Sequence, residues 1–201
     1  MSQCYGDLKR RVLELINRYS VAGETISPAY NNQSDDILRI PGLINDALLR
    51  IRTEACPRVV TCSFSHDFGQ RYGDRKAYIL PDAFRGIKTG GVYRDTGSRF
   101  EPFGDYRLLG ERMILFPDDG ATYVVEYYRA PECLPENPAD GYDMSEEPEA
   151  LTAACYYAAA MLIADRNEYR HTTLYNEFLR RMEGMVRQPT AEISTVVDVY
   201  G

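Results

Sequence analysis

The 201-residue sequence contains no tryptophan and only two histidines. No segment approaches the ~20 consecutive apolar residues that a membrane-spanning helix needs, and the first residues lack the apolar core of a signal peptide. The five cysteines are odd in number and irregularly spaced, which argues against a disulfide framework. We therefore expect a protein without membrane contact that is made in a reducing cytoplasm and folds without disulfides or metal.

Residues that could carry catalysis or hold a metal are also scarce. Cys56, Cys62 and His66 have a spacing that matches no common zinc site. Asp118 and Asp119 form an adjacent carboxylate pair, but they stand at a predicted turn, where aspartate is favoured for geometric reasons. The sequence thus offers no catalytic residues, no cofactor site and no metal site, and it does not predict an enzyme.

Clusters of basic residues are missing too, and the acidic charge is unevenly distributed. The chain has a formal net charge of -7. Residues 131–201 carry 5 basic and 13 acidic residues, a net of -8, so the rest of the chain is close to neutral. Without a basic stripe a single subunit cannot neutralise a row of phosphates, and we do not expect it to bind nucleic acid tightly.

Four segments have the apolar spacing of amphipathic helices, at about residues 7–19, 35–55, 149–166 and 172–187. Pro41-Gly42 predicts a short turn inside the second of them. Between Arg58 and Arg129 the apolar pattern changes to the two-residue period of β-strands, in short segments separated by Gly or Asp. The segments RMILFP and TYVVEYY, joined by Asp-Asp-Gly, predict a hairpin.

The expected fold class is α+β, mainly an α-helical bundle of about four helices with an inserted antiparallel β region and an extended C-terminal arm. The predicted parts follow one another along the chain. They are an N-terminal helical pair (1–57), the inserted β region (58–130), an acidic proline-rich loop (131–148), a C-terminal helical pair that completes the bundle (149–188) and the C-terminal arm (189–201). The arm has no local hairpin partner, so it pairs either with the subunit's own sheet or with another chain.

The order of these parts is carried by four segments: LINDALLRIRTEA, KAYILPDAFRGIKTGGVYRD, GERMILFPDDGATYVVEYYRAPECLP and EALTAACYYAAAMLIADR. Together they resemble the head–tail adaptor (head-completion or connector) proteins of tailed bacteriophages. In that family a Tyr-Tyr-Arg-x-Pro motif closes the β region and leads into a proline- and acid-rich loop; here the motif is Tyr127 to Pro131. The resemblance covers roughly residues 5–187 and is one of pattern and order.

The resemblance implies a structural virion protein. Its subunits would form a ring, dodecameric in this family, beneath the portal on the DNA exit path, where the ring connects the capsid to the tail during genome packaging and ejection. The implied partners are further copies of the chain, the portal protein and a tail or stopper (tail-completion) protein, while double-stranded DNA passes without specific binding. The protein would be made in the bacterial host cytoplasm and end in the neck of the virion.

Two sets of residues become candidate contact sites in this interpretation. The arm would meet the portal or a neighbouring subunit through Ile193, Val196, Val197, Val199 and Tyr200. A channel-facing set would repel DNA over a Debye length of about 8 Å at physiological salt, or would merely solvate a loop. This set consists of Glu146, Glu147 and Glu149.

Two alternatives remain open from the sequence. Another neck component, such as a stopper or tail-completion protein, is usually mostly β, so four helical patterns favour the adaptor. A neck-associated cell-wall hydrolase would need a carboxylate pair in a cleft of the β region, such as Glu111 with Asp118.

Overall fold

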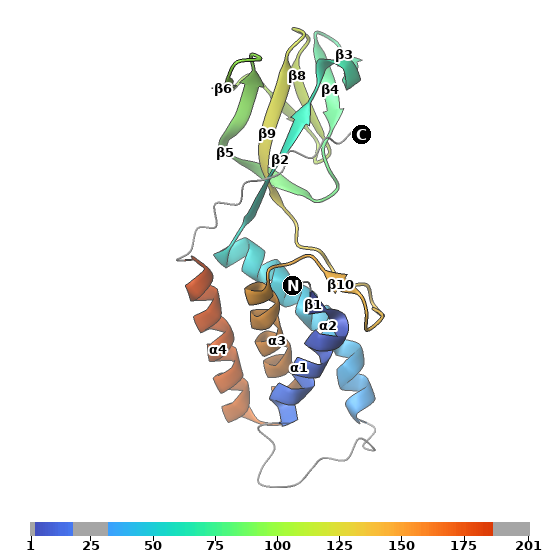
Figure 1. The fold of residues 1–201 in the computed structure, drawn as a ribbon, viewed down its shortest axis with the longest axis vertical. Coiled ribbons are helices and arrows are strands. Elements are labelled where there is room, and N and C mark those ends of the chain that lie inside the picture. Colours follow the sequence, from blue (N-terminus) through green and yellow to red (C-terminus); the bar gives the residue numbers. More distant parts are fainter. Residues whose placement is uncertain (1–2, 18–31, 187–201) are drawn as a thin grey trace. The chain divides into compact units, whose positions relative to one another are not determined.

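The computed structural model describes residues 3–17 and 32–186, which divide into two compact units. The first unit comprises the described residues up to Cys56 and from Pro131 onward, and the second comprises Pro57–Ala130. Each unit contains its own cluster of buried apolar side chains. Figure 1 labels the helices and strands of both units.

Four α-helices make up most of the described part of the first unit: α1 (Tyr5–Asn17), α2 (Asn32–Arg50), α3 (Pro148–Ile163) and α4 (Glu168–Val186). A π-helical turn, η1 (Ile51–Ala55), extends α2. α3 packs against the other three helices (Figure 1) and is buried on nearly all sides. Six of its ten buried residues are alanine, and such small side chains let neighbouring helices approach closely.

α2 runs through Pro41 without the turn that the sequence predicted. Ile40 and Ile44 are fully buried on either side of this proline. Near the start of the helix, the buried Asp36 carboxylate accepts two 2.8 Å hydrogen bonds from the guanidinium of Arg166. Apolar burial and this ion pair keep the segment helical, although proline cannot donate its backbone hydrogen bond.

A short antiparallel pair of strands also belongs to the first unit. β1 (Gln3–Cys4) pairs with β10 (Asp143–Met144). The pairing continues beyond the strands, because the Tyr5 amide donates to the Tyr142 carbonyl and the Gly6 amide to the Asp140 carbonyl, both at 2.8 Å. The start of α1 is thereby attached to the acidic segment that precedes α3.

Two four-stranded antiparallel sheets form the second unit. The first has the order β2-β9-β5-β6, with strands Arg58–Phe64, Thr122–Arg129, Phe84–Asp95 and Phe100–Pro102. The second has the order β3-β4-β8-β7, with strands Gln70–Tyr72, Arg75–Ile79, Met113–Pro117 and Arg107–Leu109. A 3₁₀ turn, η2 (His66–Phe68), links β2 to β3. Side chains of both sheets share one core rich in aromatic rings.

β8 and β9 do not form a hairpin, so that prediction is wrong. β8 pairs with β4 and β7, whereas β9 pairs with β2 and β5. The Asp-Asp-Gly turn is present, with Gly120 at a φ of 78°, but it carries the chain from one sheet to the other. Phe116 and Tyr123, on the two sides of this turn, stack across the core with their ring centroids 4.1 Å apart.

The expected fold class, mainly a helical bundle with an inserted β region and a C-terminal arm, is wrong. Besides the four α-helices, the described residues form ten strands in three antiparallel sheets, so the chain is rich in β-structure. Five strands, β1, β3, β6, β7 and β10, have only two or three residues. Strands this short have no readable two-residue period, and the sequence therefore underestimated the β content.

Candidate functional site

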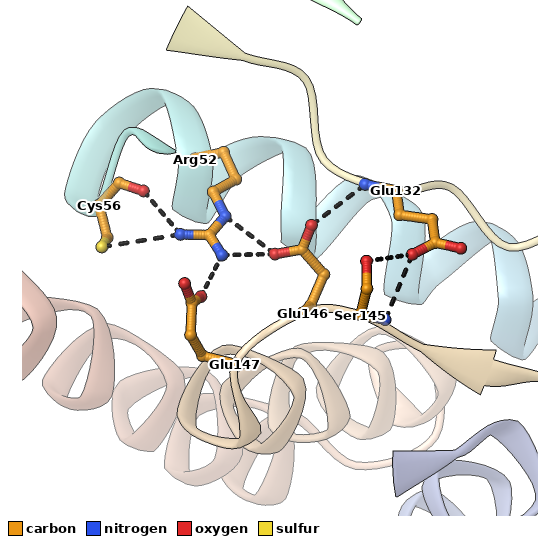
Figure 2. A network of polar contacts seen from close by, with 6 residues as sticks. All are labelled: Arg52, Cys56, Glu132, Ser145, Glu146 and Glu147. Carbon is orange, nitrogen blue, oxygen red and sulfur yellow. Dashed lines mark hydrogen bonds and ion pairs between the residues drawn. The ribbon is translucent and has the colours of Figure 1, made fainter. Parts of the chain in front are cut away.

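Residues 131–147, here named the acidic loop, are held on the first unit by a buried arginine. Arg52 lies in η1, and its side chain is only 3% exposed. Its Nε donates a 3.0 Å hydrogen bond to Oε2 of Glu146, and its Nη2 donates to both Glu146 and Glu147 (Figure 2). The Glu146 side chain is 2% exposed, so both partners of this ion pair are shielded from water.

The third side of the guanidinium contacts the backbone where η1 ends. The amide of Cys56 donates to the carbonyl of Ile51 at 2.9 Å, which closes the π-helical turn. Arg52 Nη1 in turn donates to the Cys56 carbonyl at 3.0 Å. Burial alone would lower the pKa of Arg52, but the hydrogen bonds and charges of Glu146 and Glu147 outweigh burial and raise it. The guanidinium therefore remains charged.

A second carboxylate organises the acidic loop from within. Glu146 Oε1 accepts a 3.1 Å hydrogen bond from the amide of Glu132. The Glu132 carboxylate accepts hydrogen bonds from the Tyr142 hydroxyl at 3.1 Å, the Ser145 amide at 3.2 Å and the Ser145 hydroxyl. The bond to Glu132 raises the pKa of Tyr142. Figure 2 shows that Glu132 and Glu146 join the beginning of the loop to its end.

Two contacts fix the middle of the acidic loop. The side-chain amide of Asn45 on α2 donates to the carbonyl of Leu134 at 2.9 Å and accepts from its amide at 2.7 Å. Leu134 itself is buried in the helical core. Lys9 on α1 forms an ion pair with Asp140. The loop thus has a defined conformation in spite of its prolines and its charge.

Of the three glutamates predicted to face a DNA channel, two are bonded to Arg52. Glu146 is buried and Glu147 is 35% exposed, whereas Glu149 in the first turn of α3 is exposed. Glu136 and Asp143 are also exposed and form no ion pair with another described residue. The channel-facing role stays a prediction, and these three exposed carboxylates are the ones whose charge is available for it.

Sequence reasoning missed the role of Arg52 because charged residues in helices are usually solvent-exposed. One signal was present. Arg52 follows Leu48 by four residues and so continues the buried stripe of α2. The predicted arm residues cannot be compared in this way, because Ile193, Val196, Val197, Val199 and Tyr200 lie outside the described residues.

The residues considered for catalysis have structural partners or lie apart. Asp118 bonds His66 Nε2 at 2.8 Å, and Asp119 accepts a 2.9 Å bond from the Tyr123 hydroxyl. Glu111 precedes β8 and Asp118 follows it, so a strand of about 17 Å separates them, beyond the roughly 5–9.5 Å of glycosidase pairs. Within residues 3–17 and 32–186, no His, Cys, Asp and Glu side chains cluster as metal ligands, and no helix is long and apolar enough to cross a membrane.

The sequence of residues 5–199 matches the family model described as SU10 adaptor protein. No curated protein sequence matches the chain. The family match extends over both units, so the helices and the strands belong to one family fold.

Proposed function

The chain belongs to the SU10 adaptor protein family, and from this premise we propose that its copies form a ring beneath the portal of a tailed bacteriophage. The ring would connect the capsid to the tail along the DNA exit channel. Family membership confirms the resemblance to phage head–tail adaptors and supports a structural role in the virion. The match over nearly the whole chain is the observation that carries the proposal.

The acidic loop supports a channel in which DNA slides without being held. Every phosphate contact from Lys or Arg adds affinity through counterion release, which would hinder passage of the genome. In the proposed ring the exposed carboxylates of Glu136, Asp143 and Glu149 face the channel and repel DNA over about 8 Å. Arg52 forms ion pairs with Glu146 and Glu147, of whose two charges it offsets one, and holds the loop in a fixed shape, so the exposed carboxylates keep their positions.

The proposed partners are further copies of the chain, twelve in a complete ring, together with the portal and a tail or stopper protein. The arm, residues 189–201, would lie against the portal through its alternating apolar side chains. The ring would then take part in genome packaging and ejection as a passive conduit. Another neck component is a weaker proposal, because the family described by the match is one of adaptors.

Zero-length carbodiimide cross-linking on purified virus particles tests this function. The arm contains Glu192 and Asp198 but no lysine, so carbodiimide should couple these carboxylates to lysines of the portal. We expect such links, together with links between copies of the chain. Absence of the protein from intact particles, or arm links to tail proteins alone, would contradict the assignment.

A further inference from the structure

The sheet β3-β4-β8-β7 has an apolar face that the core of the second unit does not use. Successive side chains of a strand point to opposite faces of the sheet. One face packs into the aromatic core through Tyr78, Ile114 and Phe116. On the other face, the register places the alternate side chains of β4, β8 and β7 next to one another. These apolar residues are here named the outer face: Ala77, Ile79, Leu109, Met113 and Leu115.

The outer face has the composition of a surface that another segment covers. β8 reads MILFP and is apolar throughout. An antiparallel sheet with one face in water alternates apolar and polar residues, whereas a continuous apolar run is typical of a strand covered on both faces. Ala77 and Leu115 are only 9% and 5% exposed, although neither belongs to a core cluster. Ile79 beside them is 63% exposed.

The C-terminal arm has the pattern of a segment that could cover this face. Ile193, Thr195, Val197 and Val199 follow one another at a spacing of two residues. In an extended chain such residues share one side, so the arm would present a β-branched, largely apolar side to a sheet. Its two carboxylates, at positions 192 and 198, would stand on the other side.

The charges of the sheet and of the arm are opposite. The strands β3, β4, β8 and β7 contain four basic residues and no acidic one. Arg107 lies opposite Leu115 in the register and so belongs to the side of the outer face. It is exposed and has no ion pair among the described residues. The arm contains Glu192 and Asp198 but neither lysine nor arginine.

Acidic side chains near the sheet stand beyond the ends of its strands. Within two residues of the strands they are Asp74, Asp105, Glu111, Asp118 and Asp119. Asp105 is already bonded to Arg75, at 2.6 Å. The outer face itself therefore carries no negative charge that would repel the carboxylates of the arm.

The described chain ends at a place from which the arm can reach the second unit. Arg166, just before α4, bonds Asp36 near the start of α2, and Arg50 at the end of α2 lies over the ring of Phe178 on α4. The two helices therefore run in the same direction, and α4 contacts η1, after which the chain enters the second unit. Thirteen further residues, 187–199, span up to about 45 Å, about twice the ~23 Å of the entering strand β2.

We infer that in the free chain the arm lies extended over the outer face of its own subunit, with its β-branched side against Ala77, Met113 and Leu115. The arm is then withheld until the subunit meets the portal. This second step rests on the proposed function, in which the portal binds the same arm. The outer face thus serves as a temporary partner for residues that would otherwise expose an apolar strand to other chains.

Oxidation of Met113 by hydrogen peroxide tests the contact on the free, full-length chain, because exposed methionines are oxidised faster than covered ones. Val197→Asp places a charge on the side of the arm that meets the sheet and should accelerate oxidation of Met113 severalfold. Val196→Asp changes the neighbouring residue on the other side and should not. Met182, buried in the first unit, should oxidise at the same rate in all three chains. Equal rates for Met113 in all three would overturn the inference.

Photo-cross-linking identifies the surface and the copy that supplies it. Benzoylphenylalanine replaces Val197, and light and heavy-isotope copies are mixed in equal amounts without the portal. We expect adducts to peptides covering 75–79 or 113–117, each joining residues of a single copy. Adducts to the first unit, or adducts that join a light copy to a heavy one, would overturn docking of the arm on its own subunit.

Binding to purified portal protein separates this inference from the proposed function. An arm that is docked in about nine of ten free molecules lowers the apparent affinity for the portal about tenfold, because only the undocked fraction is competent. Ile79→Asp should release the arm and tighten binding by that factor. Leu38→Asp on the first unit, at the same exposed fraction of 63%, should not tighten it. Unchanged affinity of Ile79→Asp would overturn the withholding of the arm, whereas failure of every chain to bind would overturn the proposed function and leave the oxidation result standing.

Discussion

Replacing Arg52 with methionine should destabilise the first unit strongly, because it leaves the carboxylate of Glu146 buried without its cation. Breaking a buried ion pair by removing one partner typically costs about 3–5 kcal/mol. Protonation of the unpaired carboxylate would remove its charge, so the free energy of that protonation sets an upper limit on this cost. A glutamate carboxyl has an ordinary pKa of about 4.3, so protonating an unpaired one at pH 7 costs about 3.7 kcal/mol. We therefore expect Arg52→Met to lower the free energy of unfolding by about 3–4 kcal/mol at pH 7.

The same reasoning predicts how the loss depends on pH. At pH 5 protonation of an unpaired glutamate costs only about 1 kcal/mol, so the variant should regain most of its stability on acidification. Urea unfolding followed by circular dichroism at 222 nm measures this, since the α-helices of the described residues lie in the first unit. The double variant Arg52→Met/Glu146→Gln removes both charges and should lie within about 1–2 kcal/mol of the natural chain.

A surface ion pair of the first unit supplies the control. Arg10 and Asp7 are 72% and 56% exposed, so Arg10→Met should change the free energy of unfolding by less than about 1 kcal/mol. A loss below about 1 kcal/mol for Arg52→Met would refute the view that this buried pair holds the acidic loop. So would a double variant no more stable than the single one.

Two further predictions concern the cores. Burial raises the pKa of the Cys155 thiol from 9.0 to about 12, so the thiol keeps its proton in the folded state and the free energy of unfolding should fall as pH rises from 9 toward 12. Between pH 8 and pH 10.5 the urea midpoint of Cys155→Ala should therefore decline less than that of the natural chain, and equal declines would contradict this. Gly91→Ala places a Cβ 2.9 Å from the carbonyl oxygen of Glu126 and should lower the free energy of unfolding by about 1–3 kcal/mol. Gly86→Ala on the same strand is the control, because its Cβ meets nothing within 4 Å. Hydrogen exchange of the β9 amides should accelerate in Gly91→Ala and not in Gly86→Ala.

The helices of the first unit could be predicted because their signal is local. Apolar spacing placed the third helix at residues 149–166, close to α3 at Pro148–Ile163. The fourth begins earlier than predicted, at Glu168 rather than near Thr172. The side-chain oxygen of Asn167 accepts a 3.0 Å hydrogen bond from the amide of Arg170, as an N-cap residue does. This cap starts the helix before its apolar stripe becomes visible in the sequence.

The arrangement of the second unit could not be predicted in the same way, because strand pairing is not a local property. The Asp-Asp-Gly turn indicates only that the chain reverses; it does not say whether the next strand joins the same sheet or the opposite one. The stacking of Phe116 on Tyr123 across the core stabilises the arrangement in which β8 and β9 belong to opposite sheets. The role of Arg52 was equally inaccessible, since its partners Glu146 and Glu147 lie more than ninety residues away in the sequence.

The alanine content of α3 has a consequence for the mechanics of the first unit. Alanine has no side-chain rotamers, so six of the ten buried residues of this helix become ordered without loss of side-chain entropy. A centre built in this way has few alternative packings, because backbones in close approach leave no space into which a side chain can rotate. Under mechanical load the first unit should therefore transmit force as a stiff body instead of yielding by rearrangement of its interior.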